Sequence, residues 1–292
     1  MLIIKIIKYF FQAVVIYLFF IIIKIIGLNL SRKLFSCLFN FIGPYIKSEK
    51  IINSNLEKFL GHQNDDIKKK IKFQMWSNYG KTFVEYLYLK RFKNSDIHIK
   101  LKGEEVLNKI KKNNKPVIFV SGHFANFELM SMELTKRNIN LATIYRPLNN
   151  FFMNPFMEHL RKKYICQNQI KKGLVGVKDS IHYIKKKFSV ALMVDQRVSE
   201  GKKLPFFQNM ALTTTMPAQM ALKFNLDIVP IYICRKPDDN FEMEIFEPIE
   251  TLNNEDNDEA KKLNISIKLN KILEEMISQD PGQWIWTHNR WK

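Results

Sequence analysis

The pattern of hydrophobic and polar positions divides the chain into an apolar N-terminal stretch and a longer alternating part. Residues 1–30 are apolar almost throughout, with single interruptions at Lys5, Lys8, Gln12 and Lys24. Further along, short apolar runs of strand length alternate with segments whose apolar residues recur at helical spacing. Strands alternating with helices of this length are typical of a parallel sheet covered on both faces. The sequence therefore predicts an α/β fold with a mostly parallel central sheet flanked by helices.

The elements of the alternating part follow from the same pattern. We expect a long helix over 65–91, with acidic residues in its first turn and basic residues at its end. The other expected helices cover 126–138, 154–164, 173–187, 213–225 and a last segment ending near Gln279, and the expected strands cover 116–122, 140–147, 189–196, 227–235 and 241–249. Asn126 is expected to cap the helix that follows it, and residues 31–61 to form short helical pieces broken at IGPY (42–45). No internal repeat or low-complexity linker divides residues 31–292, which we expect to be one domain.

The N-terminal stretch indicates a membrane anchor. Its uncharged part, residues 9–23, is shorter than the roughly 20 residues that cross a bilayer, but lysines near its ends can snorkel and lengthen the tolerated span. At about 100° per residue, Lys5, Lys8 and Gln12 lie on one stripe, which also permits a helix lying flat in the interface. No small-residue cleavage site follows, so a secretory signal peptide is not expected. We predict a membrane-anchoring helix over 1–30, and both orientations stay open.

Composition changes this picture little. The chain has 292 residues, 46% of them hydrophobic, which is enough for a sizeable core. The net charge of +18 reflects a general preference for Lys, since only eight of the 46 basic residues are Arg. It fits a solvated Lys-coated surface as well as a functional basic face, and no recognisable nucleic-acid-binding module accompanies it, so we expect no nucleic-acid partner. Four of the eight arginines fall in or beside the motifs described below: Arg146, Arg161, Arg197 and Arg290.

Cysteine spacing and cofactor motifs exclude several classes of site. Cys37, Cys166 and Cys234 are scattered, which fits a reducing compartment and neither a disulfide framework nor a metal site. HExxH, the P-loop and GxGxxG do not occur, so we expect neither a metal nor a nucleotide cofactor.

The stretch SGHFANFE, residues 121–128, carries the candidate chemistry. On a continuous helix His123 and Glu128 would lie about 140° apart and could not face each other. His123, however, follows an expected strand directly, at the edge where open α/β sheets keep their ligand sites. A strand-to-helix turn there could fold Glu128 back toward the imidazole, fixing one ring nitrogen and leaving the other to act as a base. The pair therefore predicts His123 as general base, oriented by Glu128.

The nucleophile must then come from the substrate. No GxSxG elbow is present, and Ser121 lies on the strand side of the turn, which makes it a weak alternative. We expect a substrate hydroxyl to lose its proton to His123 as it attacks an activated acyl group.

Five motifs occur in order along the chain: SGHFANFE, YRPLNN, VDQR followed by LPFFQNMALTTTMPAQMA, VPIYICR, and the terminal PGQWIWTHNRWK. Together they resemble the bacterial lipid A late acyltransferases of the lauroyl/myristoyl type, over nearly the whole chain. The resemblance implies a glycerolphosphate-acyltransferase-like fold and transfer of a fatty acyl chain from acyl carrier protein to a hydroxyl of a lipid A precursor. In that family the hydroxyl is on an acyl chain already attached to the phosphorylated glucosamine disaccharide. It also implies the bacterial inner membrane, with the catalytic domain on the cytoplasmic side.

The resemblance also implies roles for single residues. It places the family's His-x4-Asp/Glu motif on His123 and Glu128, and Asp195 in VDQR matches a position that the family uses at its active site. Arg146 in YRPLNN is expected to hold a phosphate or orient the thioester, with a loop-closing salt bridge as the equal alternative. Arg161 matches the family's basic position after the dipeptide NP, although the spacing differs.

Other positions keep two interpretations. The hydroxyls of TTT (213–215) either bind a phosphate or cap the helix that follows. His288 and Arg290 in the terminal motif are expected to be structural or to lie at the substrate rim. The lysine-rich segments 67–72 and 110–115 fit acidic partners such as acyl carrier protein and lipid phosphates.

Two alternatives to the lipid A activity stay open. One is an acyltransferase acting on another glycolipid or on a glycerol-phosphate acceptor. The other, less favoured, is a non-enzymatic basic protein of the membrane surface.

Overall fold

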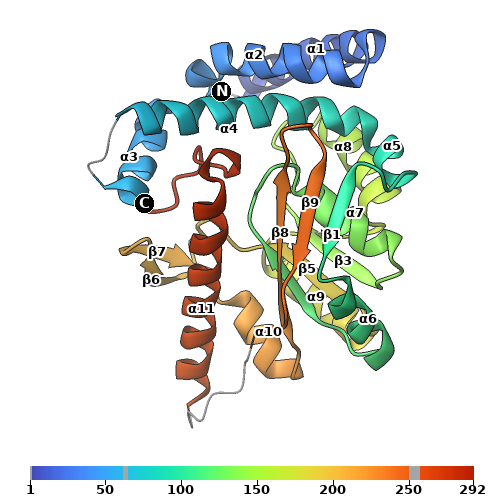
Figure 1. Cartoon of the computed structure of the whole chain (residues 1–292), viewed down its shortest axis with the longest axis vertical. Coiled ribbons are helices and arrows are strands. Elements are labelled where there is room, and N and C mark those ends of the chain that lie inside the picture. Colours follow the sequence, from blue (N-terminus) through green and yellow to red (C-terminus); the bar gives the residue numbers. More distant parts are fainter. Residues whose placement is uncertain (1, 62–64, 250–256) are drawn as a thin grey trace.

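The computed structural model describes residues 2–61, 65–249 and 257–292, and in this part of the chain a seven-stranded sheet forms the centre (Figure 1). Its strands are β1 (Ile99–Lys102), β2 (Ile118–Ser121), β3 (Leu141–Tyr145), β4 (Asn168–Lys171), β5 (Ser189–Met193), β8 (Ile228–Arg235) and β9 (Phe241–Ile245). They are ordered β1-β9-β8-β2-β5-β3-β4. From β8 to β4 every pairing is parallel, and β9 pairs antiparallel with β8 and parallel with β1. The predicted mostly parallel α/β sheet is confirmed.

The helices flank this sheet and form a layer at one end of it. They are α1 (Leu2–Ile26), α2 (Leu28–Ile46), α3 (Glu49–Leu60), α4 (Asp65–Glu85), α5 (Leu89–Lys93), α6 (Glu104–Asn113), α7 (Glu128–Lys136), α8 (Asn154–Leu160), α9 (Leu174–Lys185), α10 (Met216–Phe224) and α11 (Asp258–Gln279). In Figure 1, α1, α2 and α4 lie together beyond one end of β8 and β9. A small hairpin of β6 (Lys202–Phe206) and β7 (Asn209–Thr213) packs against α11.

The centre of the sheet is apolar on both faces. Every residue of β2 and of β8 is buried, as expected for parallel strands covered on both sides. β2 lies between β8 and β5, and Ser121 at its end pairs in register with Met193 at the end of β5. The residues two positions further on, His123 and Asp195, therefore leave the sheet side by side at the same edge.

Helix α1 is long and apolar enough to cross a membrane, by length and composition, with a mean hydropathy of 2.3 over Ile3–Ile26. One face of it packs on the rest of the chain: the Tyr17 hydroxyl donates to the Phe152 carbonyl at 3.3 Å and Lys24 Nζ to the Leu87 carbonyl at 2.6 Å. A core helix of a soluble protein would be mostly buried, whereas Ile4 and Phe11 are 71% and 62% exposed.

Several predicted boundaries differ from the structure. α2 continues through IGPY to Ile46 with Pro44 inside it, so the predicted break there is wrong. Pro44 lies in the last turn of α2. In the same turn α2 packs closely on α4, since a Cβ on Gly43 would lie 2.4 Å from the Trp76 ring. The expected helix over 65–91 ends at Glu85, and a 3₁₀ turn follows it.

The hairpin, β1 and β4 were not expected from the pattern. Phe207 and Gln208 both have positive φ angles of 47° and 58°, the geometry of a two-residue hairpin turn. Such turns normally carry Asn or Gly, so their usual sequence signal is missing here. α10 begins at Met216, because Thr213 still belongs to β7.

Candidate functional site

A cavity of about 780 Å³ opens at the carboxyl ends of β2, β3 and β5. This volume lies in the range of small-molecule sites. Its charged and polar lining includes His123, Glu128, Arg146, Arg161, Lys172 and His288, and its apolar lining includes Ile144, Leu148, Val177, Met193, Val198 and Met216. The site residues expected from the sequence thus gather around one cavity, with Asp195 directly behind His123.

Asp195 holds His123 in place. One carboxylate oxygen lies 2.8 Å from His123 Nδ1, and the other accepts the His123 backbone N–H, also at 2.8 Å. The indole N–H of Trp284 donates to the second oxygen at 2.8 Å. Burial raises the pKa of Asp195, but the His123 ring and these hydrogen bonds outweigh it and lower that pKa to about 2.

The tautomer of His123 follows from this pairing. Asp195 is a carboxylate at neutral pH and accepts from Nδ1, so the ring proton of a neutral His123 lies on Nδ1. Nε2 then carries the free lone pair, and it makes no hydrogen bond to any other residue that the structure describes. The side chain is 18% exposed and lines the cavity. The arrangement therefore provides a base that a hydroxyl in the cavity can reach.

Glu128 has a different partner from the one expected. Its carboxylate accepts from the Tyr86 hydroxyl at 2.6 Å and forms an ion pair with Arg161, whose Nη2 lies 2.6 Å away. Within the described ranges it makes no hydrogen bond to His123, so the expected orientation of the imidazole by Glu128 is corrected to Asp195. The physical reason is that α7 starts at Glu128 and turns its carboxylate toward the single π-helical turn after α8 that carries Arg161.

The Glu128–Arg161 pair is itself well buried. Glu128 is 7% exposed and Arg161 8%. Burial lowers the pKa of Arg161, but Glu128 and Tyr86 raise it above its ordinary value, so the guanidinium stays charged. Burial also raises the pKa of Tyr86, and the Glu128 charge adds to this, which keeps the phenol protonated.

The turn after β2 is held by hydrogen bonds to the C-terminal segment and to α4. Ala125 adopts φ 43°, a conformation that side chains other than Gly seldom take, and its N–H donates to the Gln283 carbonyl at 3.0 Å. Its carbonyl accepts from Asn78 and Thr82 on α4. The expected cap at Asn126 is wrong, because α7 begins at Glu128, two residues later, and the Asn126 amide donates instead to Glu85 at 2.9 Å.

Glu85 anchors this turn to two further elements. It is fully buried and binds Arg235 at the end of β8 and Arg32 of α2, with an Arg32 Nε distance of 2.8 Å. Both guanidinium groups form charge-assisted hydrogen bonds with the Glu85 carboxylate, which fix it as the acceptor for the Asn126 amide. The position of His123 therefore depends on α4, α2 and β8 as well as on β2.

Arg146 and Lys172 form an exposed basic edge of the cavity. Although the Lys172 side chain is exposed overall, partial burial of its ammonium group lowers the pKa of Lys172, and the nearby positive charge of Arg146 lowers it further. Arg146 forms no hydrogen bond or ion pair with any other described residue. It is thus free to meet an anion, and the loop-closing salt bridge is not formed.

The threonines 213–215 divide between two roles. The hydroxyl of Thr213 accepts from Arg290 Nη2 at 2.9 Å and serves the packing of the C-terminus. Thr214 and Thr215 line the cavity.

Trp284 was not assigned a place in the site from the sequence, and His288 was expected to be structural or to lie at the substrate rim; both belong to the site. Trp284 holds Asp195, and His288 lines the cavity beside His123. The available signal was the concentration of tryptophan and histidine in the last motif. In residues 2–61, 65–249 and 257–292, no cluster of three or more His, Cys, Asp or Glu side chains is arranged to hold a metal.

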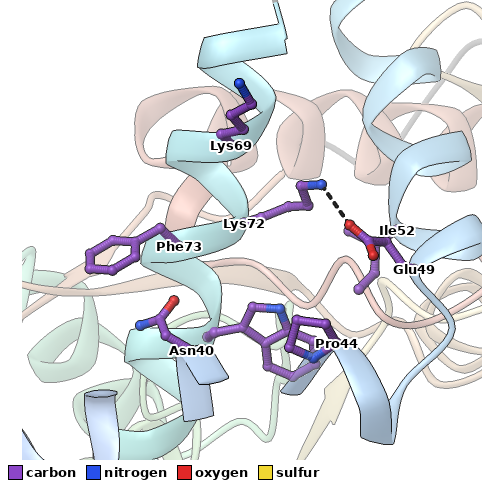
Figure 2. Close-up of a pocket in the computed structure, with 8 residues that line it drawn as sticks. Asn40, Pro44, Glu49, Ile52, Lys69, Lys72 and Phe73 are labelled. Atoms are coloured by element: carbon purple, nitrogen blue, oxygen red, sulfur yellow. Dashed lines mark hydrogen bonds and ion pairs between the residues drawn. The ribbon is translucent and has the colours of Figure 1, made fainter. Parts of the chain in front are cut away.

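A second, smaller pocket of about 180 Å³ lies between α2, α3 and α4 (Figure 2). Its lining shares no residue with the large cavity. Lys72 crosses toward Glu49, with Nζ and Oε1 2.9 Å apart, and Lys69 pairs with Asp66. These two lysines of the segment 67–72 are therefore already engaged in ion pairs with acidic groups of the chain itself.

Comparisons with known proteins agree with the motifs. Residues 4–292 match the family model described as bacterial lipid A biosynthesis acyltransferase. A lipid A biosynthesis palmitoleoyltransferase of Escherichia coli (strain K12) is 25% identical over 262 residues, covering 85% of this chain and 80% of that protein. A lipid A biosynthesis acyltransferase of Shigella flexneri shows the same identity and coverage.

Proposed function

Because the chain belongs to the bacterial lipid A biosynthesis acyltransferase family, we propose that it is a membrane-bound O-acyltransferase. It moves a fatty acyl chain from acyl carrier protein to a hydroxyl of a lipid A precursor. The observation that carries this proposal is the His123–Asp195 pair, with an unpartnered Nε2 on the wall of a cavity of about 780 Å³.

The proposed chemistry uses His123 twice. Nε2 takes the proton of the acceptor hydroxyl as its oxygen forms a bond to the thioester carbonyl carbon, and Asp195 stabilises the resulting imidazolium. The carbonyl then re-forms, the carbon–sulfur bond breaks, and the imidazolium returns the proton to the leaving thiolate. A thioester is already activated, so base catalysis worth about 10²–10⁴-fold, added to positioning, is sufficient.

Arg161, Arg146 and Lys172 are proposed to bind substrate. Glu128 keeps the Arg161 guanidinium at the cavity wall, so its role is to position that cation for the substrate. Arg146 and Lys172 supply exposed positive charge for a phosphate of the acceptor or of the donor's carrier.

The location we propose is the inner membrane, with the catalytic domain on the cytoplasmic side. Residues 1–30 form the anchoring part and 31–292 the catalytic domain. The apolar exposed face of α1 supports this, since it would bring the cavity close to an acceptor held in the bilayer.

The test is an assay of the purified full chain in liposomes, with acyl–acyl carrier protein and a phosphorylated glucosamine disaccharide lipid as substrates. Mass spectrometry should find the lipid heavier by one acyl chain. Glycerol 3-phosphate and a neutral glycolipid serve as competing acceptors. No acylated product, or acylation of the competing acceptors alone, would reject the proposed activity.

A further inference from the structure

A second imidazole, His288, lines the same cavity as His123 and is held firmly in place. Its backbone carbonyl accepts from the Asn55 amide at 2.7 Å. The hydroxyl of the preceding Thr287 is hydrogen-bonded to the Tyr79 hydroxyl at 2.7 Å. The terminal segment that carries His288 is thus fixed to α3 and α4.

The ring of His288 has a defined tautomer. The backbone N–H of Arg197 donates to His288 Nε2 at 3.0 Å. A backbone N–H can only donate, so Nε2 must offer a lone pair, and the proton of the neutral ring lies on Nδ1.

The ring is also neutral at physiological pH. Burial lowers the pKa of His288, the Asp195 charge opposes this, and His123, Lys172 and Arg290 lower it further, to about 4. At neutral pH His288 therefore offers one donor, Nδ1–H, and does not compete with His123 for a proton.

This donor belongs to a side chain that lines the cavity. No residue that the structure describes accepts a hydrogen bond from Nδ1. The atom is nevertheless accessible, because it is not among the buried side-chain nitrogen and oxygen atoms that lack a partner. Arg161 also lines the cavity, but its Nε and Nη2 are bonded to Glu128 and Tyr86, which leaves only the buried Nη1 without a partner among the described residues.

The positions of base and donor are coupled by one short loop. Asp195 holds His123, and Arg197, two residues further along the chain, holds His288. Trp284 ties the same loop to the terminal segment through Asp195. Two imidazoles with opposite roles, one a free acceptor and one a free donor, are therefore fixed relative to each other.

We propose that His288 donates its Nδ1–H to the carbonyl oxygen of the acyl thioester and stabilises the negative charge that develops there during attack. The inference rests on the acyl transfer proposed above. As the acceptor oxygen bonds to the carbonyl carbon, the carbon–oxygen electron pair moves onto the carbonyl oxygen, where a preorganised neutral donor is most effective. This electron pair re-forms the carbonyl double bond when the thiolate leaves, and His288 keeps its proton throughout.

Two substitutions separate this role from a structural one. In His288→Gln the side-chain amide reaches the place of Nε2, which keeps a partner for Arg197 but removes the donor. In His288→Asn the shorter amide lies near the place of Nδ1, which keeps a donor but loses the contact with Arg197. We expect kcat to fall about 10²–10³-fold in His288→Gln with KM little changed, the loss seen when one such donor is removed. The Asn variant should stay within about tenfold of the unmodified protein, since it keeps one donor of the kind that such sites use.

The readouts are kcat and KM for acyl transfer, with thermal unfolding to verify folding. An active Gln variant beside an inactive Asn variant would show that the ring only supports Arg197, and equal losses in both would also overturn the proposal. If the unmodified protein transfers no acyl chain, the proposed function fails instead, so the two failures are distinguishable.

Discussion

The pairing of His123 with Asp195 is a consequence of strand register. Ser121 of β2 lies opposite Met193 of β5. Two residues beyond each of these positions come His123 and Asp195, so the imidazole and the carboxylate lie side by side. Sequence alone indicated His123, because an imidazole just after a buried strand lies at the ligand-binding edge. It could not indicate which carboxylate would reach the ring. Glu128 is near in sequence, but Arg161, 33 residues further on, attracts it more strongly.

We expect Asp195→Asn to lower kcat about 10³–10⁴-fold. An amide can present its N–H to Nδ1 and so favour the wrong tautomer, and it cannot stabilise an imidazolium. Steady-state acyl transfer measures the loss. Asp258→Asn, at the first turn of α11, is the matched control and should keep full activity.

Glu128→Gln distinguishes the two carboxylates. It leaves the Arg161 cation buried without its anion, so we expect a lower free energy of unfolding. The pH dependence of the remaining activity should keep its form, because the ring of His123 keeps Asp195. A shift of the acidic limb of that profile in Glu128→Gln would instead assign the imidazole to Glu128.

The free energy of unfolding should decrease at acidic pH because of His288. The pKa of His288 is about 4 in the folded chain and 6.5 in the unfolded chain, so between these pH values the unfolded chain binds a proton that the folded chain does not bind. The contribution of the neutral His288 ring to the free energy of unfolding is fully present above pH 6.5. It is lost as the pH falls toward 4, by at most about 1.4 kcal/mol per pH unit. Urea unfolding between pH 7 and 4.5 should show a shallower decline in His288→Gln. Parallel declines in both proteins would contradict this assignment.

At the scale of elements, long apolar runs were predictable and irregular turns were not. The strands β2, β3, β5, β8 and β9 fall within their expected ranges, since the first four are largely apolar runs and β9 alternates apolar residues with Glu242 and Glu244. The β6–β7 hairpin was missed because its turn is Phe207–Gln208, and tertiary packing overrides the weak local preference. The continuation of α2 through Pro44 likewise depends on its contact with α4, which no local pattern encodes.

Gly80 tests that contact. A Cβ at this position would lie 2.1 Å from the Phe35 carbonyl oxygen of α2, so Gly80→Ala must push the two helices apart. The substitution normally favours a helix by about 1 kcal/mol. Here we expect it to lower the melting temperature, together with acyl transfer, because Arg32 on α2 would be drawn away from Glu85. Lys69→Ala, on the exposed side of α4, is the control, and a raised melting temperature in Gly80→Ala would contradict the close packing.

At the scale of the whole molecule, the helical layer at one end combines an apolar exposed surface with residues that hold the turn after β2, which carries His123. α1 exposes its apolar residues outward, while α2 reaches through Arg32 to Glu85 and so to Asn126. The sequence indicated a membrane segment through its composition. It could not indicate that the following helix supports the proposed active site, because that link consists of a buried ion pair between residues 53 positions apart.

The exposed face of α1 should determine membrane association. Phe11 and Leu18 are 62% and 54% exposed and lie two turns apart on this face. Replacing both with Lys should weaken flotation with anionic liposomes while leaving thermal unfolding unchanged. Val175→Lys, at a side chain 68% exposed on α9, is the matched control and should float as before. Equal flotation of all three proteins would reject the anchoring role of this face.

The most direct test of the account is the rate of acyl transfer from acyl carrier protein to the lipid A precursor, measured by mass spectrometry for His123→Ala. The solvent-exposed His159→Ala on α8 serves as its control. The account predicts that His159→Ala transfers the acyl chain at the rate of the unmodified protein, while His123→Ala, folded and still bound to the liposomes, is slower by at least about 10²-fold. An unchanged rate in His123→Ala would contradict the assignment of this imidazole as the base.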